Sequence, residues 1–144
     1  MSKHANLGKK AEKQVQAWLE ARSAAGVAFA FHRFPDARAA RGMLAAQPSD
    51  YLVAHRGRMV LLEVKETQQE RRLPKAKVSQ YGALLKFYLA GSDVIVLVYR
   101  STTSDWVYLD ADNLFDNAEC PPSFPLYNLP AFASASDALE EIFR

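Results

Sequence analysis

The sequence contains a single cysteine, Cys120, and no apolar run near the roughly 20 residues that cross a bilayer. One cysteine excludes a disulfide within the chain and a zinc site built from several thiolates. The N-terminal stretch shows no apolar segment followed by a cleavage site, so we expect no secretory signal and a cytoplasmic protein. The three histidines lack metal-ligand spacing, and no glycine-rich phosphate loop is present.

The composition is that of an ordinary globular protein. The 144 residues predict one domain, and 49% of them are apolar and 24% charged. The net charge of +2 does not by itself indicate nucleic acid, but basic residues are concentrated in the first three-fifths of the chain. From Asp105 on, only Arg144 is basic. This asymmetry is compatible with one phosphate-binding face and equally with a solvated surface.

The hydrophobic pattern predicts an alternation of helices and strands. We expect helices over 6–24, 76–90, 111–116 and 134–143, and strands over 27–34, 50–55, 58–66, 93–100 and 105–110. The remaining stretches, 35–48, 67–75 and the proline-rich 120–130, are expected to be a loop or short helix, a basic loop and an irregular segment. This order predicts an α/β fold, a single domain with a central mixed sheet flanked by helices.

The stretch "MVLLEVKE" (59–66) places a carboxylate and an ammonium in an otherwise apolar strand. Because side chains alternate along a strand, Glu63 and Lys65 should share one face with Leu61. A turn at Gly57 would fold the preceding strand back along this one, so that Asp50 reaches the level of Glu63. We therefore expect two carboxylates and an ammonium to converge at one end of the sheet.

Such a cluster has specific chemistry. Two nearby carboxylates raise each other's pKa, and a divalent cation removes the conflict. Mg²⁺ is typically bound by one or two carboxylates plus substrate phosphate. A neighbouring Lys65 would position a water or stabilise charge developing on phosphorus. The alternative that the residue types leave open is a structural salt bridge between Lys65 and Asp50 or Glu63.

Glu12 lies at the border of the apolar stripe of the first helix, and Gln80 lies on the face of the second helix that Ala83, Leu84 and Phe87 are expected to turn to the core. Glu12 could add a third carboxylate to the metal site, or be a solvated acid of the first helix. Gln80 precedes Leu84 by one turn, so it could support the site or be a buried amide that hydrogen-bonds within the core.

The motifs resemble those of a known family of nucleases. "PSD" (48–50), twelve residues and then "EVK" (63–65) resemble the signature of the PD-(D/E)XK nuclease superfamily. Within it, the layout is similar to Holliday junction resolvases of the archaeal and RecU-like type. The shared features are a helical glutamate in "GKKAEKQV" (8–15), a serine before the aspartate, "EVKET" (63–67), and a glutamine in "SQYGALLKF" (79–87). The chain departs from the pattern where Ser49 separates Pro48 from Asp50.

The resemblance covers about residues 6–110, a catalytic core, and leaves 111–144 as a C-terminal extension. It implies a restriction-endonuclease-like fold in which Glu12, Asp50 and Glu63 bind one or two Mg²⁺ ions, with Mn²⁺ as a substitute. The Val64 carbonyl would be an extra ligand and Lys65 would orient or activate the water. The resemblance also implies that Gln80 supports the site. Ser49 would contact the phosphate or the outer ligands of the metal.

The resemblance also implies a partner and an oligomeric state. Such resolvases act in DNA recombination and repair as homodimers, and their paired sites cut opposing strands of a four-way junction. We expect several basic residues to contact phosphates, drawn from Lys9, Lys10, Arg33, Arg38, Arg41, Arg71, Arg72, Lys75 and Lys77. Two alternatives remain at this point, a nuclease of the same fold with another DNA substrate and a non-catalytic nucleic-acid-binding module.

Overall fold

Helices and strands alternate along the chain in the computed structural model, which describes residues 3–26, 28–35, 47–116 and 122–144, with side chains from residue 9 on. The strands are β1 (Phe29–Arg33), β2 (Tyr51–His55), β3 (Arg58–Thr67), β4 (Arg72–Pro74), β5 (Asp93–Arg100), β6 (Asp105–Leu109) and β7 (Ser123–Pro125). The helical elements are α1 (Lys3–Ala24), a 3-10 turn η1 (Lys75–Lys77), α2 (Tyr81–Leu89), α3 (Ala111–Phe115) and α4 (Ala135–Ile142).

Five of these strands form one mixed sheet in the order β1-β2-β3-β5-β6. β3 and β5 are parallel and are joined by a crossover that contains α2, whereas the other neighbours are antiparallel. β5 reads as a continuous apolar run because both faces of the sheet are covered at this position. The predicted α/β fold, a central mixed sheet flanked by helices, is confirmed.

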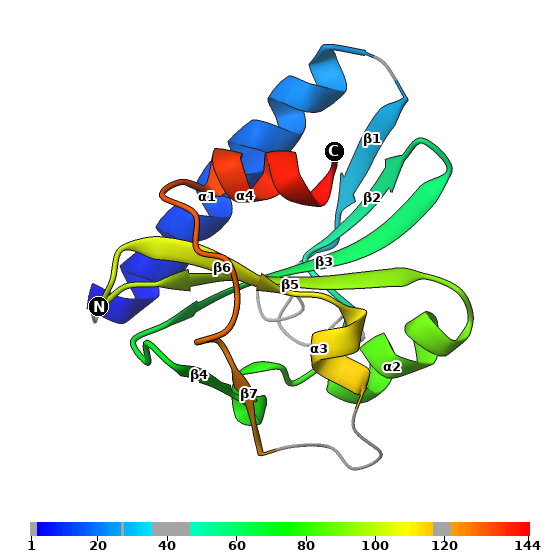
Figure 1. Ribbon diagram of the computed structural model, residues 1–144. Coiled ribbons are helices and arrows are strands. Elements are labelled where there is room, and N and C mark those ends of the chain that lie inside the picture. Colours follow the sequence, from blue (N-terminus) through cyan, green and yellow to red (C-terminus); the bar gives the residue numbers. More distant parts are fainter. Residues whose placement is uncertain (1–2, 27, 36–46, 117–121) are drawn as a thin grey trace.

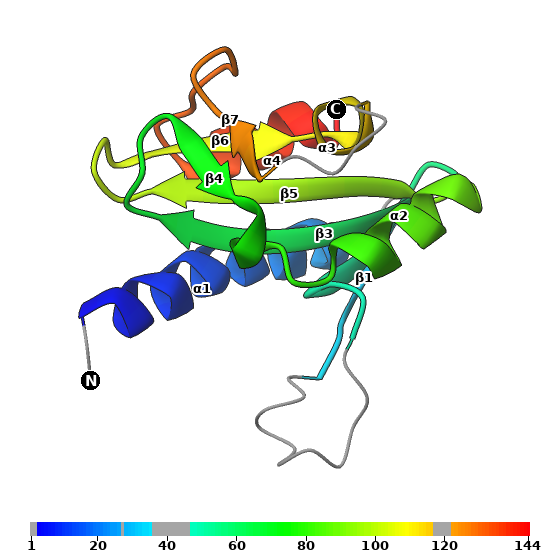
Figure 2. The same ribbon diagram turned by 90° about the horizontal axis from the view of Figure 1, so that it is seen from below.

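Two layers cover the sheet, one on each face (Figures 1 and 2). α1 and α4 pack on one face, where Val60, Leu62 and Val64 of β3 join an apolar cluster. α2, α3 and the β4–β7 pair cover the other face, where Leu61 joins a second cluster. The side chains of β3 therefore alternate as predicted, and Glu63 and Lys65 belong to the face of Leu61.

The β2–β3 hairpin sets the register of the future site. Arg56 and Gly57 both adopt positive φ, 48° and 80°, as a two-residue turn of the type favoured in hairpins requires. The turn aligns Tyr51 opposite Leu62, so that Asp50 precedes β2 next to the level of Glu63. The predicted hairpin is confirmed, and with it the approach of Asp50 to β3.

Two predictions about local structure were wrong. The second helix begins at Tyr81, five residues later than expected, and Leu84 is its buried residue, whereas Ala83 and Phe87 are exposed. Segments expected to be a loop and irregular contain β4 and β7, which pair antiparallel with Leu73 opposite Phe124. Leu73 and Phe124 are both fully buried, so their packing against the sheet stabilises the pairing of β4 with β7.

Most of the predicted loop 35–48 lies outside the described residues. In the described part of the chain, no helix is long and apolar enough to cross a membrane.

Candidate active site

Asp50 lies where the β2–β3 ladder ends, and its side chain takes the place of a strand partner. The Val64 N–H donates a 2.8 Å hydrogen bond to Asp50 Oδ2. On the other side, the Phe34 N–H donates to the Asp50 carbonyl oxygen at 2.9 Å, which ties the residue to the end of β1. These two hydrogen bonds fix the carboxylate beside the middle of β3.

Glu63 and Lys65 lie next to this carboxylate on β3. The Lys65 Nζ atom is 2.9 Å from Glu63 Oε1, and the exposed fractions of the two side chains are 22% and 1%. The glutamate is thus enclosed, while the ammonium reaches toward solvent. The predicted convergence of two carboxylates and an ammonium is observed.

Burial raises the pKa of both acids, and the charge of Asp50 adds to the rise at Glu63. Burial, followed by the negative charge of Asp50, raises the pKa of Glu63 to about 7, although the Lys65 ammonium lowers it. Burial also raises the pKa of Asp50, against the opposing effects of the Val64 N–H, Lys65 and Arg33. Near neutral pH Glu63 therefore holds a proton in part of the molecules, and a divalent cation beside the two acids would take the place of that proton.

The two carboxylates of the cluster fit a magnesium ion that takes its other ligands from water and phosphate. Glu63 Oε2 is buried and receives no hydrogen bond from the described residues, so a proton or a cation is needed beside it. No group of three or more His, Cys, Asp or Glu side chains that could hold a metal occurs among the described residues. Two carboxylates still match Mg²⁺, which binds through one or two of them and completes its ligands with water and phosphate.

Glu12 lies on α1, which covers the face of the sheet opposite Glu63. It is partly buried and near Tyr51, whose pKa rises to about 12, first through burial and then through the charge of Glu12. The Tyr51 hydroxyl donates to Gln16 Oε1 at 3.4 Å, one helical turn further along α1. Because Tyr51 directly follows Asp50, Glu12 lies at the same end of the sheet as the acidic pair, although on the other layer.

Ser49 and Gln80, the other two predicted polar site residues, have partners within the chain. The Ser49 hydroxyl is buried and donates to the Tyr51 carbonyl oxygen at 2.9 Å. Gln80 precedes α2, and its side-chain oxygen accepts a 3.1 Å hydrogen bond from Ser79. No hydrogen bond among the described residues joins Gln80 to Asp50 or Glu63, so its role in the site stays a prediction.

The predicted phosphate-binding residues that the structure describes fall into three regions. Arg33 ends β1 opposite Tyr51, and its charge lowers the pKa of Asp50, so this cation is close to the site. Lys9 and Lys10 are exposed on α1 in the other layer. Those that remain are exposed on or beside β4 and η1: Arg71, Arg72, Lys75 and Lys77. Arg38 and Arg41 lie outside the described residues.

A surface hollow at the end of β3 was not predicted. It has a volume of about 300 Å³ and is lined by Glu66, Thr67, Gln68, Gln69 and Lys77. Lys65 immediately precedes these residues on the strand. The signal in the sequence was the uncharged polar pair "QQ" directly after "EVKET", which we assigned to a basic loop.

No known family model matches the sequence. No curated protein matches it significantly either. Among solved structures, the chain is similar to Hjc, a Holliday junction resolvase from the archaeal hyperthermophile Archaeoglobus fulgidus, with a TM-score of 0.53 and 14% identity. The match covers 92% of this chain and 99% of that one. At this identity the likeness establishes the fold: the chain has the α/β fold of an archaeal junction resolvase over almost its whole length.

Proposed function

We propose that the protein is a Mg²⁺-dependent DNA endonuclease that cuts four-way junctions. The observation that carries the proposal is the buried pair of Asp50 and Glu63 with Lys65 at its open side, in a resolvase-like fold. A purely structural salt bridge would need one carboxylate, whereas a second one raises the pKa of the first and costs stability. Strained acid pairs of this kind are typical of functional sites.

In this proposal Asp50 and Glu63 hold Mg²⁺, with the Val64 carbonyl as a further ligand. Backbone N–H and C=O groups of one strand residue point to the same neighbour, so the Val64 carbonyl lies on the side of Asp50, to which its N–H donates. Glu12 lies on the other layer of the sheet and does not form a group of three with these carboxylates among the described residues, so its role as a third ligand stays a prediction. When bound, the ion supplies positive charge to the phosphate and lowers the pKa of a water.

The chain's own residues then orient the reaction. The Lys65 ammonium, held by Glu63, faces the open side of the cluster, where it positions the attacking water or stabilises the charge that develops on the phosphate oxygens. Arg33, beside Asp50, contributes a second positive charge for the DNA backbone. Hydrolysis breaks the bond between phosphorus and the 3′ oxygen and leaves a 3′-hydroxyl and a 5′-phosphate.

The test is a comparison of substrates with and without Mg²⁺. We expect the protein to cut a synthetic four-way junction at least about tenfold faster than a linear duplex of the same sequence. The reason is that the arms of a junction present one phosphodiester to each of the two paired sites at the same time. Excess EDTA should abolish cleavage, and Mg²⁺ or Mn²⁺ should restore it. The measurement is the initial rate of product formation on labelled strands.

The outcomes separate three possibilities. Equal cleavage of duplex and junction would reject the resolvase assignment and leave a nuclease with another substrate. Binding of DNA without any metal-dependent cleavage would indicate a non-catalytic module. Cleavage that persists in EDTA would contradict the proposed site.

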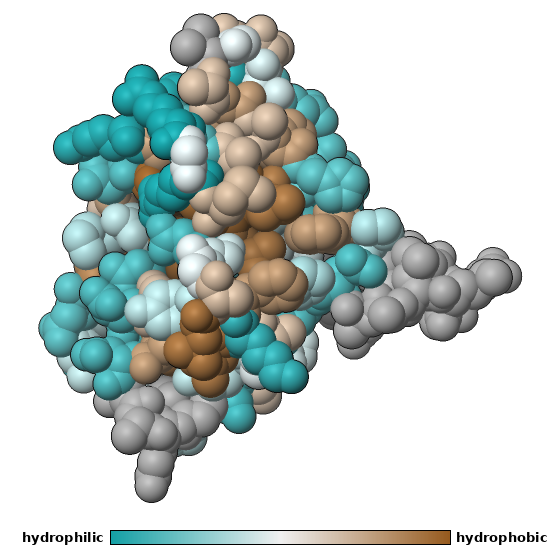
Figure 3. Space-filling view, turned by 90° about the vertical axis from the view of Figure 1, so that its right-hand side faces the viewer, coloured by the Kyte–Doolittle hydropathy of each residue, from teal (hydrophilic) through white to brown (hydrophobic). Residues whose placement is uncertain are grey.

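The proposal also requires two copies of the chain. Paired cuts on opposing strands need two sites, whereas the described residues of one chain hold one Asp50–Glu63–Lys65 cluster. An apolar surface on α2 and the start of β3 is available for the contact, with Met59, Phe87, Tyr88 and Leu89 between 36% and 74% exposed. Apolar side chains form a band across this face of the molecule (Figure 3).

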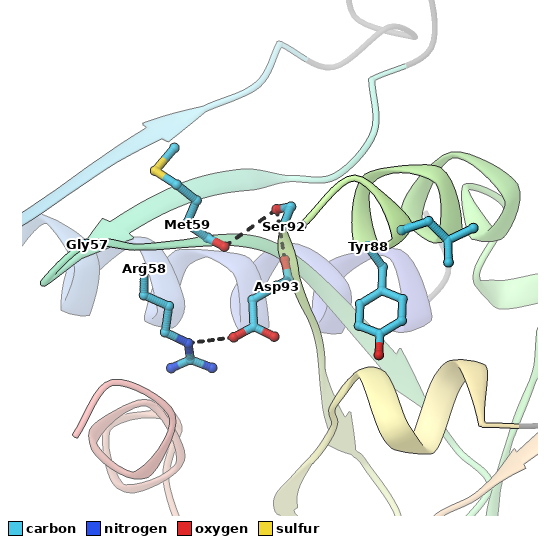
Figure 4. A pocket seen from close by; sticks show the side chains of 8 residues that line it. Gly57, Arg58, Met59, Tyr88, Ser92 and Asp93 are labelled. Carbon is cyan, nitrogen blue, oxygen red and sulfur yellow. Dashed lines mark hydrogen bonds and ion pairs between the residues drawn. The ribbon is translucent and has the colours of Figure 1, made fainter.

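This dimer surface, as we name Met59 and residues 87–89, borders a hollow of about 540 Å³. Figure 4 shows Met59 and Tyr88 on its sides and the ion pair of Arg58 with Asp93, 2.6 Å apart, at its edge. The Asp50 end of β2 and the hairpin turn are at opposite ends of the strand, so a partner bound here would leave the site open to DNA.

We expect the wild-type protein to sediment at twice the chain mass of 16.1 kDa. Leu89→Glu, at the most exposed position of the dimer surface, should shift it to the monomer, because a charge cannot be buried there without a partner. Ala21→Glu, at an exposed position on α1, is the matched control and should stay dimeric. A wild-type monomer at micromolar concentration would reject this part of the proposal.

A further inference from the structure

The β4–β7 pair presents a rigid outer surface that the catalytic cluster does not use. Leu73, Phe124 and Leu126 are fully buried beneath it and anchor both segments to the sheet. The Leu126 N–H donates to the Arg71 carbonyl oxygen at 2.7 Å, which extends the pairing by one step beyond the strands. With these residues pointing inward, the outward positions include Arg72, so the surface is fixed by the core beneath it.

Arg71 and Tyr127 are exposed at one end of this surface, where Arg71 precedes β4 and Tyr127 follows β7. The Arg71 Cζ atom lies 4.9 Å from the centroid of the Tyr127 ring, and the tyrosine is 48% exposed. Stacking of this kind restrains both side chains before any ligand arrives. Tyr127 lies in the turn after β7 and directly follows the buried Leu126, so its half-exposed ring is held next to an anchored residue.

The charge around this pair is predominantly positive. Between residues 68 and 77 the sequence carries one acid, Glu70, and four basic residues. Arg72 Nε donates to Ser123 Oγ at 2.6 Å, and Lys75 Nζ lies 5.5 Å from the Tyr81 ring, so both cations are oriented by the chain. Ordered cations along a strand pair with an accessible ring at its end are typical of surfaces that bind single-stranded nucleic acid.

The position of the surface connects it to the proposed site. Residues 68–71 join β3 to β4, and the Arg100 side chain holds this connection by a 2.7 Å hydrogen bond from Nη1 to the Glu70 carbonyl oxygen. β4 and β7 lie on the face of the sheet to which Glu63 and Lys65 belong (Figure 2). The hollow at the end of β3, with Lys77 in its wall, lies at the start of this connection.

We propose that Arg71 and Tyr127 form a stacking platform for an unpaired nucleotide of the DNA substrate, with Arg72 and Lys75 on its phosphates. This inference rests on the proposed function, because it concerns the part of the DNA substrate that extends beyond the Asp50–Glu63–Lys65 cluster. A fully paired duplex offers phosphates but no free base face, so it gains from the cations alone. A strand with an unstacked base gains from the ring as well.

The experiment measures DNA binding in a Glu63→Gln background by fluorescence anisotropy. Two probes are compared, a linear duplex and the same duplex with a single-stranded flap. Tyr127→Leu should weaken binding of the flapped probe about tenfold and leave the duplex within twofold, while Tyr127→Phe should bind both like the parent. Arg71→Ala should weaken binding of both probes and make log Kd depend less steeply on log salt concentration, by about 0.7 to 0.9 for each phosphate that the protein no longer neutralises.

Arg56→Ala is the matched control. Arg56 is an exposed arginine of the β2–β3 hairpin turn, at the end of β2 away from Asp50, and its substitution should leave the Kd for both probes unchanged. Thermal unfolding of Tyr127→Leu would show that the variant is folded. Parent-like binding of the flapped probe by Tyr127→Leu, or an equal loss on both probes, would overturn the platform. A parent that binds neither probe would overturn the platform, and a parent that also fails to bind a four-way junction would overturn the proposed function as well. Metal-dependent cleavage with no effect of Tyr127 would overturn the platform alone.

Discussion

Glu63→Gln should lower Mg²⁺-dependent DNA cleavage at least about a thousandfold and make the metal-free protein more stable above pH 7. The amide keeps the size of the side chain but offers a neutral oxygen, so it binds Mg²⁺ weakly. A bound cation contributes several kcal/mol to stabilisation of charge in the transition state, which corresponds to at least about three orders of magnitude in rate. Asp50→Asn should have a similar effect on the rate.

The gain in stability follows from the direction of the pKa shift. The pKa of Glu63 rises from 4.5 to about 7 on folding, mainly because the carboxyl group is buried. Its contribution to the free energy of unfolding is complete below pH 4.5 and is lost as the pH rises through 7. The shift corresponds to roughly 3 kcal/mol and already includes the attraction that Lys65 exerts on the carboxylate. Glu63→Gln regains only part of it, because the neutral amide leaves the Lys65 ammonium without its charged partner. We therefore expect a gain of about 1–2 kcal/mol at pH 8 and little at pH 4.

Urea unfolding in EDTA at both pH values measures this gain, and added Mg²⁺ gives an independent readout. Mg²⁺ should stabilise the wild type and leave Glu63→Gln unchanged, because only a protein that binds the ion gains from it. Glu20→Gln, an exposed acid on α1, is the control for loss of a negative charge. Full cleavage by Glu63→Gln, or equal stabilisation of both proteins by Mg²⁺, would show that the ion binds elsewhere.

The sequence was informative where two patterns agreed. Alternation along 59–66 and the glycine turn at 57 together placed Glu63, Lys65 and Asp50 on one face, because a hairpin register leaves no freedom once the turn is known. The same reasoning identified β5 as a covered strand from its unbroken apolar run. These elements depend on contacts between neighbours in the chain, which a pattern can express.

The parts that were missed depend on distant contacts. β4 and β7 are three residues each and pair Leu73 with Phe124, which no local periodicity can indicate. Phe87 followed the helical spacing of a core residue, yet its side chain is 45% exposed. Glu12 could be assigned to a helix face, but its distance from Glu63 depends on how α1 packs across the sheet.

Lys65→Ala should lower kcat for cleavage by about 100- to 1000-fold, and the loss should persist at saturating Mg²⁺ and at pH 9. The ammonium has one effect that the structure shows and one that the proposed function adds. It lowers the pKa of Glu63 from 2.9 Å away. In the proposed function its side chain, which is 22% exposed, also contacts the phosphate or the attacking water. Loss of the first effect raises the pKa of Glu63 further and weakens cation binding near neutral pH, which more Mg²⁺ and higher pH reverse.

Loss of the contact with phosphate or water is not reversed by more Mg²⁺ or by higher pH, because no other group among the described residues occupies the position of Lys65 Nζ. Lys65→Arg separates the two: its positive charge should keep the pH profile close to the wild type, while the bulkier, planar guanidinium should recover only part of kcat. Lys13→Ala, an exposed lysine on α1, is the control for the loss of a positive charge. Complete recovery of Lys65→Ala at high pH and saturating Mg²⁺ would mean that Lys65 only keeps Glu63 ionised, and the orientation of water would then have to come from Arg33 or from the substrate itself.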